Sequence, residues 1–167
     1  MTVQVRVADR RGLDIARRRL AEAWGDPILV RGAAYRLADC DVLIAGDFDG
    51  LAAISRRDAP VAELVALNAF TPRRGIGTAL LAALPGFLGP AFRQIRLTTT
   101  NANLDALRFY QRRGYRLAAL RPGAVDLARR EPFRGSATMV CRCAMISTWC
   151  SICEAANEDA SLHRLLE

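Results

Sequence analysis

The segment TPRRGIGT, residues 71–78, constrains the fold of this 167-residue chain more than any other feature. It joins a strand-like apolar run, Val61–Leu67, to a run of apolar residues at helical spacing, Ile76–Leu84. Gly75 and Gly77 allow the backbone to come close to a ligand, and the first turn of a following helix directs free N–H groups at it. A strand, a glycine loop and a helix in this order suit a pyrophosphate group.

Two other phosphate-binding loops do not fit these residues. A Walker loop ends in Gly-Lys-Ser/Thr, and the chain contains no lysine. A Rossmann fingerprint needs a glycine where Leu80 stands. An isolated Gly-x-Gly is also typical of a plain turn at the start of a helix, so the surrounding sequence has to decide between a turn and a site.

The remaining pattern predicts one α+β domain with a single, mostly antiparallel sheet. A strand at Val3–Val7 precedes a helix whose apolar face carries Leu13, Ala16, Leu20 and Trp24. Pro85 and Gly86 are expected to shorten or kink the helix after the glycine loop. The other expected elements are a β-meander with strands at Ile28–Val30, Val42–Ala45 and Leu51–Ile54, strands at Ile95–Thr100 and Tyr115–Leu120, and a helix at Asn103–Arg113 ended by Gly114.

The charge of the chain comes from arginine alone. All 24 basic residues are Arg, and the formal net charge is +7. Such a surface attracts CoA phosphates, an acidic acceptor or RNA alike, and a solvated surface is favoured over a nucleic-acid site. No apolar run approaches the roughly 20 residues of a membrane span, and the opening lacks the apolar core of a signal peptide. These features predict a cytoplasmic protein without a membrane partner.

Four successive blocks resemble the GNAT (GCN5-related) N-acetyltransferase superfamily over roughly residues 55–121. They read AELVAL, RRGIGTALL, IRLTTT and NANLDALRFYQRRGYRL. In the last block the family pattern Asn-x-x-Ala-x-x-x-Tyr before Gly and an aromatic is matched by Asn103, Ala106, Tyr110, Gly114 and Tyr115. The resemblance implies the GNAT fold, a mixed and mostly antiparallel sheet flanked by helices, with strands that splay apart at the acetyl-CoA site.

The resemblance also implies a reaction in which an amine attacks the thioester of acetyl-CoA directly. The only histidine is His163, so Ser-His and Cys-His nucleophile schemes have little support. Tyr110 matches the position that protonates the departing thiolate, with a packed core tyrosine as the alternative. Glu63 matches a general base, with a solvated strand carboxylate as the alternative.

The residues implied to bind acetyl-CoA come from the strand, the glycine loop and the last helix. The strand Leu64–Leu67 would pair with the pantetheine amides, and one of its N–H groups would polarise the thioester carbonyl. Pro72 replaces the family's usual arginine or glutamine, so Arg73 and Arg74 are expected to compensate. Asn103 would bind CoA or cap its helix. The complete set is Leu64, Val65, Ala66, Leu67, Arg73, Arg74, Gly75, Gly77, Thr78 and Asn103.

The chain departs from the family near Glu131, so residues 1–130 are assigned to the acetyltransferase domain and 131–167 to an atypical tail. In the family the last strand inserts between Ile95–Thr100 and Tyr115–Leu120, and the tail lacks its acidic, aliphatic pattern. One hypothesis is a frameshift, which predicts a poorly filled slot and lower stability. The other is a zinc site, a loose match to usual spacings, formed by Cys141, Cys143, Cys150 and Cys153. No metal is expected.

The sequence therefore predicts an acetyl-CoA-dependent N-acetyltransferase. A catalytically weak or inactive CoA-binding GNAT module is the alternative, and an RNA-binding protein comes third. The acceptor amine and the choice between monomer and homodimer stay open, because the variable segments that would contact an acceptor carry no recognisable code.

Overall fold

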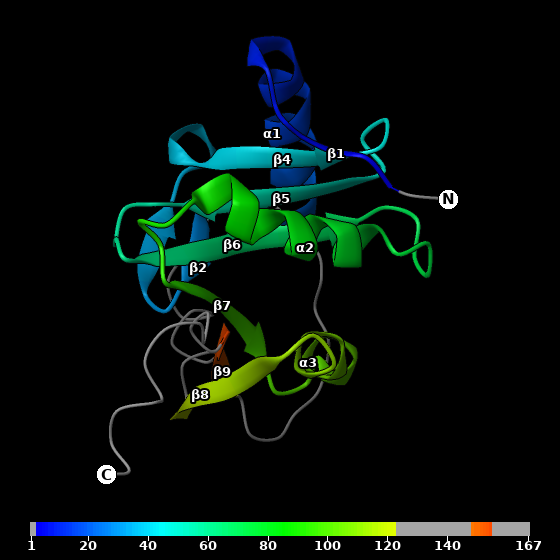
Figure 1. The fold of residues 1–167 in the computed structure, drawn as a ribbon. Helices are drawn as coiled ribbons and strands as arrows, with labels where there is room; N and C mark the ends of the chain where they lie inside the picture. The colour runs from blue at the N-terminus through cyan, green and yellow to red at the C-terminus, as the bar shows by residue number, and fades with distance from the viewer. Residues whose placement is uncertain (1–2, 123–147, 155–167) are drawn as a thin grey trace, which may run out of the picture.

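The computed structural model describes residues 3–122 and 148–154, which form a sheet of strands with helices packed against it (Figure 1). The prediction of an α+β fold is confirmed, and most predicted elements lie within two residues of their expected bounds. The elements are β1 Val5–Val7, α1 Arg10–Trp24, β2 Ile28–Val30, β3 Ala33–Tyr35, the 3-10 turn η1 Leu37–Asp39, β4 Asp41–Ala45, β5 Gly50–Ser55, β6 Val61–Ala69, α2 Ile76–Leu88, β7 Gln94–Thr100, α3 Leu104–Gln111, β8 Tyr115–Pro122 and β9 Thr148–Glu154.

The central element of the described fold is one mixed sheet with the strand order β1-β4-β5-β6-β7-β9-β8. Its neighbouring strands are antiparallel except for β6 and β7, which run parallel. This confirms the predicted mixed, mostly antiparallel sheet. The strand β9 comes from the atypical tail and pairs with both β7 and β8. The tail therefore places a strand in the slot where the family resemblance put the last strand.

The predicted meander is wrong at its first strand. The strand β2 lies outside the main sheet and pairs with β3 in a separate hairpin. The two turn residues Arg31 and Gly32 have φ angles of 54° and 81°. Positive φ at both positions is typical of the two-residue turn whose twist matches that of a hairpin. The three-residue β3 is too short to show an alternating pattern, so no sequence pattern predicted it.

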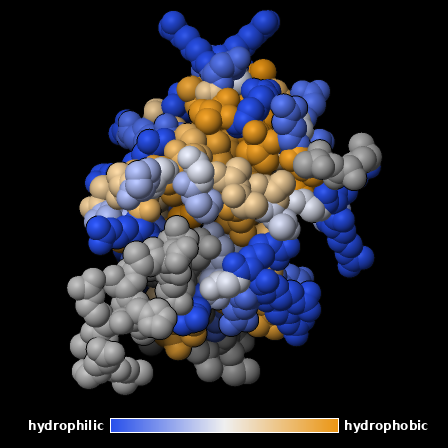
Figure 2. All heavy atoms as spheres, in the orientation of Figure 1, coloured by the Kyte–Doolittle hydropathy of each residue, from blue (hydrophilic) through white to orange (hydrophobic). Residues whose placement is uncertain are grey.

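Two apolar cores cover the two faces of the sheet. One packs α2 on the sheet through residues such as Leu80 and Leu84, and the other packs α1 and the β2–β3 hairpin through residues such as Leu20 and Tyr35. Figure 1 shows α2 in front of the strands and α1 behind them. In Figure 2 apolar residues gather over α2 and the neighbouring strands, and hydrophilic residues gather around α3.

Two expectations about the helices are corrected. The helix α2 continues through Pro85 to Leu88, since the amide of Gly89 still bonds to the Pro85 carbonyl at 3.0 Å and buried Leu84 and Leu88 hold this end against the core. Trp24 is 46% exposed, so the buried face of α1 ends at Leu20. In the described part of the chain, no helix has the length and apolar character needed to cross a membrane.

Candidate active site

The strands β6 and β7 separate at the centre of the sheet. Their parallel pairing begins at Val61 and Gln94 and ends at Leu64 and Leu97. Both strands continue, β6 to Ala69 and β7 to Thr100, without further pairing to each other. The predicted cofactor strand Leu64–Leu67 therefore starts where this fork opens. Beyond Leu64 the backbone N–H and C=O groups that point toward β7 have no partner on that strand, so they can form hydrogen bonds with another molecule.

A β-bulge lies at the same point of β6. Ala53 pairs with Ala66 and Ile54 with Leu64, so Val65 is an extra residue in the ladder. The bulge also interrupts the alternation of faces, because Val65 and Ala66 both pack in the core on the α1 side while Leu64 packs on the α2 side. Bulges re-aim backbone groups and are over-represented next to active sites. This backbone irregularity was not predicted from the sequence.

The glycine loop leads directly into α2, as predicted. Gly75 has φ 75° in the left-handed region and precedes the helix without a side-chain cap, and Arg73 has φ 62°. The first-turn N–H groups of α2 thus have no capping side chain, and they lie at the positive end of the helix dipole. Arg73 and Arg74 are exposed beside them. This loop can bind an anion such as a pyrophosphate.

Gly77 has a packing role that was not predicted. A Cβ atom at this position would lie 3.0 Å from Cζ of Phe109, so the absent side chain makes room for the ring of α3. Gly77 therefore permits close packing of α2 against α3. The sequence did not distinguish this packing role from a close approach to a ligand, because both require a small residue.

Tyr110 lies on α3, on the α2 side of the sheet. Its half-buried ring packs against the core and makes edge-to-face contacts with Phe109 at 5.2 Å and Tyr115 at 5.6 Å between centroids. Burial raises the pKa of its hydroxyl to about 12. The phenol is therefore protonated at neutral pH and is able to donate a proton.

Glu63 lies on the opposite, α1 side of the sheet and is only 1% exposed, which excludes the solvated carboxylate. Its Oε2 atom accepts hydrogen bonds from Nη2 of Arg31 at 2.8 Å and from Nε of Arg96 at 2.7 Å. Its Oε1 atom is buried and has no hydrogen-bond partner among the described residues. Neither arginine was predicted, since Arg31 lies 32 and Arg96 33 residues away in sequence, and no local pattern joins them to Glu63.

Asn103 caps α3, which confirms one of its two predicted roles. Its Oδ1 atom accepts a hydrogen bond of 3.1 Å from the amide of Ala106. Cys40, the one cysteine in the body of the chain, is buried, and burial beside Asp39 and Asp41 raises the pKa of its thiol to about 11. That thiol is inert at neutral pH.

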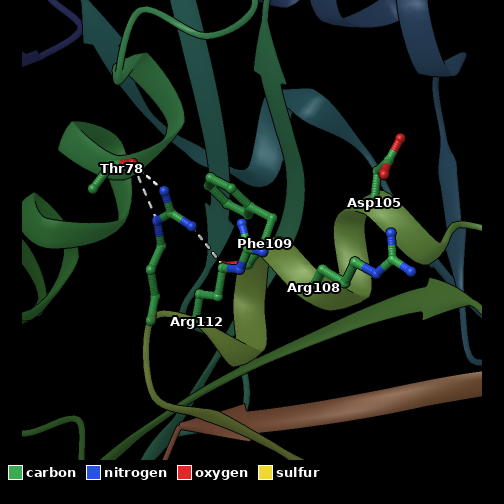
Figure 3. Close-up of a pocket in the computed structure, with 6 residues that line it drawn as sticks. Thr78, Asp105, Arg108, Phe109 and Arg112 are labelled. Atoms are coloured by element: carbon green, nitrogen blue, oxygen red, sulfur yellow. Dashed lines mark hydrogen bonds between the residues drawn. The ribbon is translucent and has the colours of Figure 1, made fainter.

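A pocket lies between α2 and α3, next to the glycine loop. Figure 3 shows Thr78 of α2 at one side and Asp105 and Arg108 of α3 at the other. Arg113 donates to the hydroxyl of Thr78 from Nε at 3.1 Å and also from Nη2, and to the carbonyl of Phe109 from Nη1 at 2.6 Å. Thr78 therefore lies in the predicted region, with its hydroxyl already engaged by an arginine that was not predicted.

The four cysteines of the alternative zinc hypothesis lie in the tail. Cys141 and Cys143 lie outside the described residues, and only the backbone of Cys150 and Cys153 is described, in β9. Within residues 3–122 and 148–154 no group of three or more His, Cys, Asp or Glu side chains could hold a metal ion.

Sequence comparisons identify the family. The model of the acetyltransferase (GNAT) family matches residues 17–115. The uncharacterized protein YdhI of Bacillus subtilis is 37% identical over 123 residues, which are 66% of this chain and 72% of YdhI. The chain belongs to the GNAT acetyltransferase family.

Solved structures share the fold at low sequence identity. A GNAT family acetyltransferase from Elizabethkingia anophelis with acetyl-CoA bound has a TM-score of 0.59 at 14% identity, over 92% of this chain and 97% of that one. A Bacillus subtilis acetyltransferase in complex with CoA has a TM-score of 0.63 at 13% identity, over 92% of this chain and 99% of that one. These likenesses agree with the GNAT fold read from the strand order.

Proposed function

We propose that this protein transfers the acetyl group of acetyl-CoA to an amine by direct attack on the thioester. The observation that carries the proposal is the fork between β6 and β7, which opens at the bulge on Val65 and lies beside the glycine loop. An unpaired strand edge suits the pantetheine amides, and the uncapped start of α2 suits the pyrophosphate. Both features belong to consecutive elements of the chain, β6 and α2.

Backbone groups at the bulge would supply the electrostatic part of catalysis. As the amine attacks, negative charge develops on the thioester oxygen, and an N–H group aimed at that oxygen stabilises the transition state. The extra residue Val65 frees a backbone group near the mouth of the fork from the ladder with β5. This role uses backbone groups, so the side chains at Leu64–Leu67 matter little for it. The four side chains are aliphatic and carry no polar group of their own.

Tyr110 and Glu63 would act from opposite faces of the fork. Tyr110 is on the α2 side, where its protonated hydroxyl would give a proton to the departing thiolate. Glu63 and its partner Arg31 are on the α1 side, under the β2–β3 hairpin. We propose that the amine enters from this second face and that Glu63 removes its proton, directly or through a water molecule.

One observation favours the alternative of a CoA-binding module with little turnover. The Oε2 atom of Glu63 already accepts from two guanidinium groups, which compete with an incoming ammonium for the carboxylate. Only Oε1 has no partner among the described residues. A base held in this way is well positioned but less free to take a proton.

Two measurements separate the two candidates. Isothermal titration with acetyl-CoA tests the cofactor site, and release of free thiol during incubation with a panel of amines, amino acids, aminoglycosides and N-terminal peptides tests transfer. Binding with thiol release that depends on the amine is the expected result. Binding without any release would favour the module, and absence of binding would overturn both proposals.

A further inference from the structure

The pocket between α2 and α3 has a volume of about 510 Å³ and a basic lining. It contains three arginines and one acidic residue, so it favours an anion of more than one charge. Its lining residues are Thr78, Asp105, Arg108, Phe109, Arg112 and Arg113. Figure 2 shows hydrophilic residues concentrated over this part of the surface.

The three arginines differ in what they already contact. Arg113 is committed to the protein, since it bonds to Thr78 and to the carbonyl of Phe109 and lies 3.7 Å above the ring of Phe109. Arg108 and Arg112 are exposed, and within residues 3–122 their guanidinium groups have no hydrogen bond or ion pair. Arg108 lies in the last turn of α3 and Arg112 is its C-cap residue in helical conformation, so the two side chains are neighbours at spacing four at the end of the helix. Two uncommitted guanidinium groups therefore lie beside one held in place.

The position of the pocket limits which part of a ligand it can contact. Thr78 belongs to the first turn of α2, which follows the glycine loop directly, so the pocket adjoins the end of that loop. In coenzyme A the pantetheine, the pyrophosphate and the 3′-phosphorylated ribose follow one another. A molecule with its thioester in the fork and its pyrophosphate at the glycine loop would extend its ribose toward this pocket.

We propose that Arg108 and Arg112 bind the 3′-phosphate of coenzyme A and make the protein selective for acetyl-CoA over its 3′-dephospho form. A phosphomonoester carries up to two negative charges near neutral pH, and guanidinium groups bind phosphate oxygens in a bidentate geometry. Arg113 shapes the wall by holding α3 against Thr78. The inference rests on the proposed function, because it uses CoA as the cofactor, and it names a selectivity that acetyl transfer does not require.

The test compares CoA with 3′-dephospho-CoA, two molecules that share the pantetheine and the pyrophosphate. Isothermal titration at constant ionic strength is expected to give about 10-fold or tighter binding of CoA by the unmodified protein, a ratio typical of one strong charge-assisted contact. The variant Arg108→Gln/Arg112→Gln should lose most of this ratio and bind 3′-dephospho-CoA with unchanged affinity. The matched control Arg11→Gln/Arg18→Gln removes the same charge from exposed positions of α1 and should keep the ratio.

Several outcomes would overturn the inference. Equal binding of the two molecules by the unmodified protein removes the selectivity, even where acetyl transfer is intact. A parallel loss of affinity for both molecules in the α3 variant assigns these arginines to the pyrophosphate, and the same loss in the α1 control assigns the effect to net charge. If neither molecule binds, the proposed function fails as well, which distinguishes that failure from the others.

Discussion

Arg31 donates from Nη2 to Oε2 of Glu63 at 2.8 Å and thereby ties the β2–β3 hairpin to the strand that carries the fork. Arg31 has φ 54°, a left-handed conformation that costs a non-glycine residue on the order of 1 kcal/mol. The ion pair, with the side chain of Glu63 only 2% exposed, offsets that strain. The hairpin and the candidate base are therefore held together on the α1 side of the sheet.

Replacing Glu63 by glutamine is expected to lower stability. The substitution removes the carboxylate that pairs with Arg31 and Arg96, of which Arg96 keeps a pair with Asp58 at 3.6 Å, and breaking a buried ion pair by removing one partner typically costs several kcal/mol. We expect a loss of about 2–4 kcal/mol in the free energy of unfolding, measured by urea denaturation. As a control, Asp41→Asn breaks a pair with Arg56 in which both side chains are more than a third exposed, and should cost about 1 kcal/mol or less. Similar losses in the two variants would contradict the assignment.

Two glycines of α2 give a matched test of helix packing. Gly86→Ala meets no atom within 4 Å and should stabilise the helix by about 0.5–1 kcal/mol. Gly77→Ala gains the same propensity but places Cβ 3.0 Å from Cζ of Phe109, whose ring also packs against the guanidinium group of Arg113 at 3.7 Å. Overpacking costs about 1–3 kcal/mol, so Gly77→Ala should be the less stable of the two by about that amount.

The measurement for this pair is the thermal midpoint of each variant against the unmodified chain. The second-site change Phe109→Leu should recover part of the loss in Gly77→Ala, because it removes the atom that the new Cβ meets. A Gly77→Ala protein as stable as Gly86→Ala would show that Phe109 moves aside freely.

Much of the fold could be predicted from the sequence because its signals are local. Apolar periodicity located α1, α2 and the long strands, and Gly75 marked the start of α2. The three-residue strand β3 carried too few residues to show a period. Pro85 misled the prediction because burial of Leu84 and Leu88 outweighs the local preference of proline to end a helix.

Parts of the candidate site that carry a local residue pattern were predicted from the sequence. Contacts between residues far apart in the sequence were missed. The glycine loop precedes α2 as predicted, and Tyr110 packs against the core on the α2 side of the sheet. The ion pairs of Glu63 depend on a hairpin turn and on a parallel neighbour strand, so only the folded chain brings Arg31 and Arg96 to it. The bulge at Val65 is a property of strand register, which the identity of the residues does not encode locally.

Alkaline pH is expected to destabilise the protein in part through Cys40. Its folded pKa is raised from 9.0 to about 11, so below pH 9 the thiol is protonated in both the folded and the unfolded state. Between pH 9 and 11 the unfolded thiol ionises while the buried one does not, and the stabilising contribution is lost as pH rises through this window. The loss from this group is at most about 3 kcal/mol.

The measurement is the slope of unfolding free energy against pH from 8 to 11 in the unmodified chain and in Cys40→Ala. A shallower slope in the variant is expected, since the titrating group is gone. Equal slopes would mean that other groups carry the alkaline loss. Because the comparison is between slopes, the cavity left by the smaller side chain does not affect it.

The tail offers a test of the frameshift hypothesis. GC-rich codons for residues 132–152, read two nucleotides further along, can spell VPRIGDDGVPLRDDLDLVLD. A chain with its last 37 residues replaced by this reconstructed ending should melt at a higher temperature, because the hypothesis gives it the last strand that matches the slot between β7 and β8. Sequencing the coding DNA gives an independent result, since the codons either permit the shifted reading or do not. An unchanged melting temperature would count against the hypothesis.

Removing the hydroxyl of Tyr110 separates catalysis from packing. Tyr110→Phe keeps the ring that contacts Phe109 and Tyr115, so the affinity for acetyl-CoA and the melting temperature should change little. A lost general acid typically costs about 100-fold or more in kcat, measured as thiol release at saturating acetyl-CoA. Since burial raises the pKa of this hydroxyl to about 12, the pH profile of kcat for the variant should keep its shape below about pH 10 and differ only in height.

The control Tyr35→Phe makes the same chemical change on the α1 side of the sheet and should leave kcat within about twofold. A Tyr110→Phe protein with full kcat would assign that residue to the core.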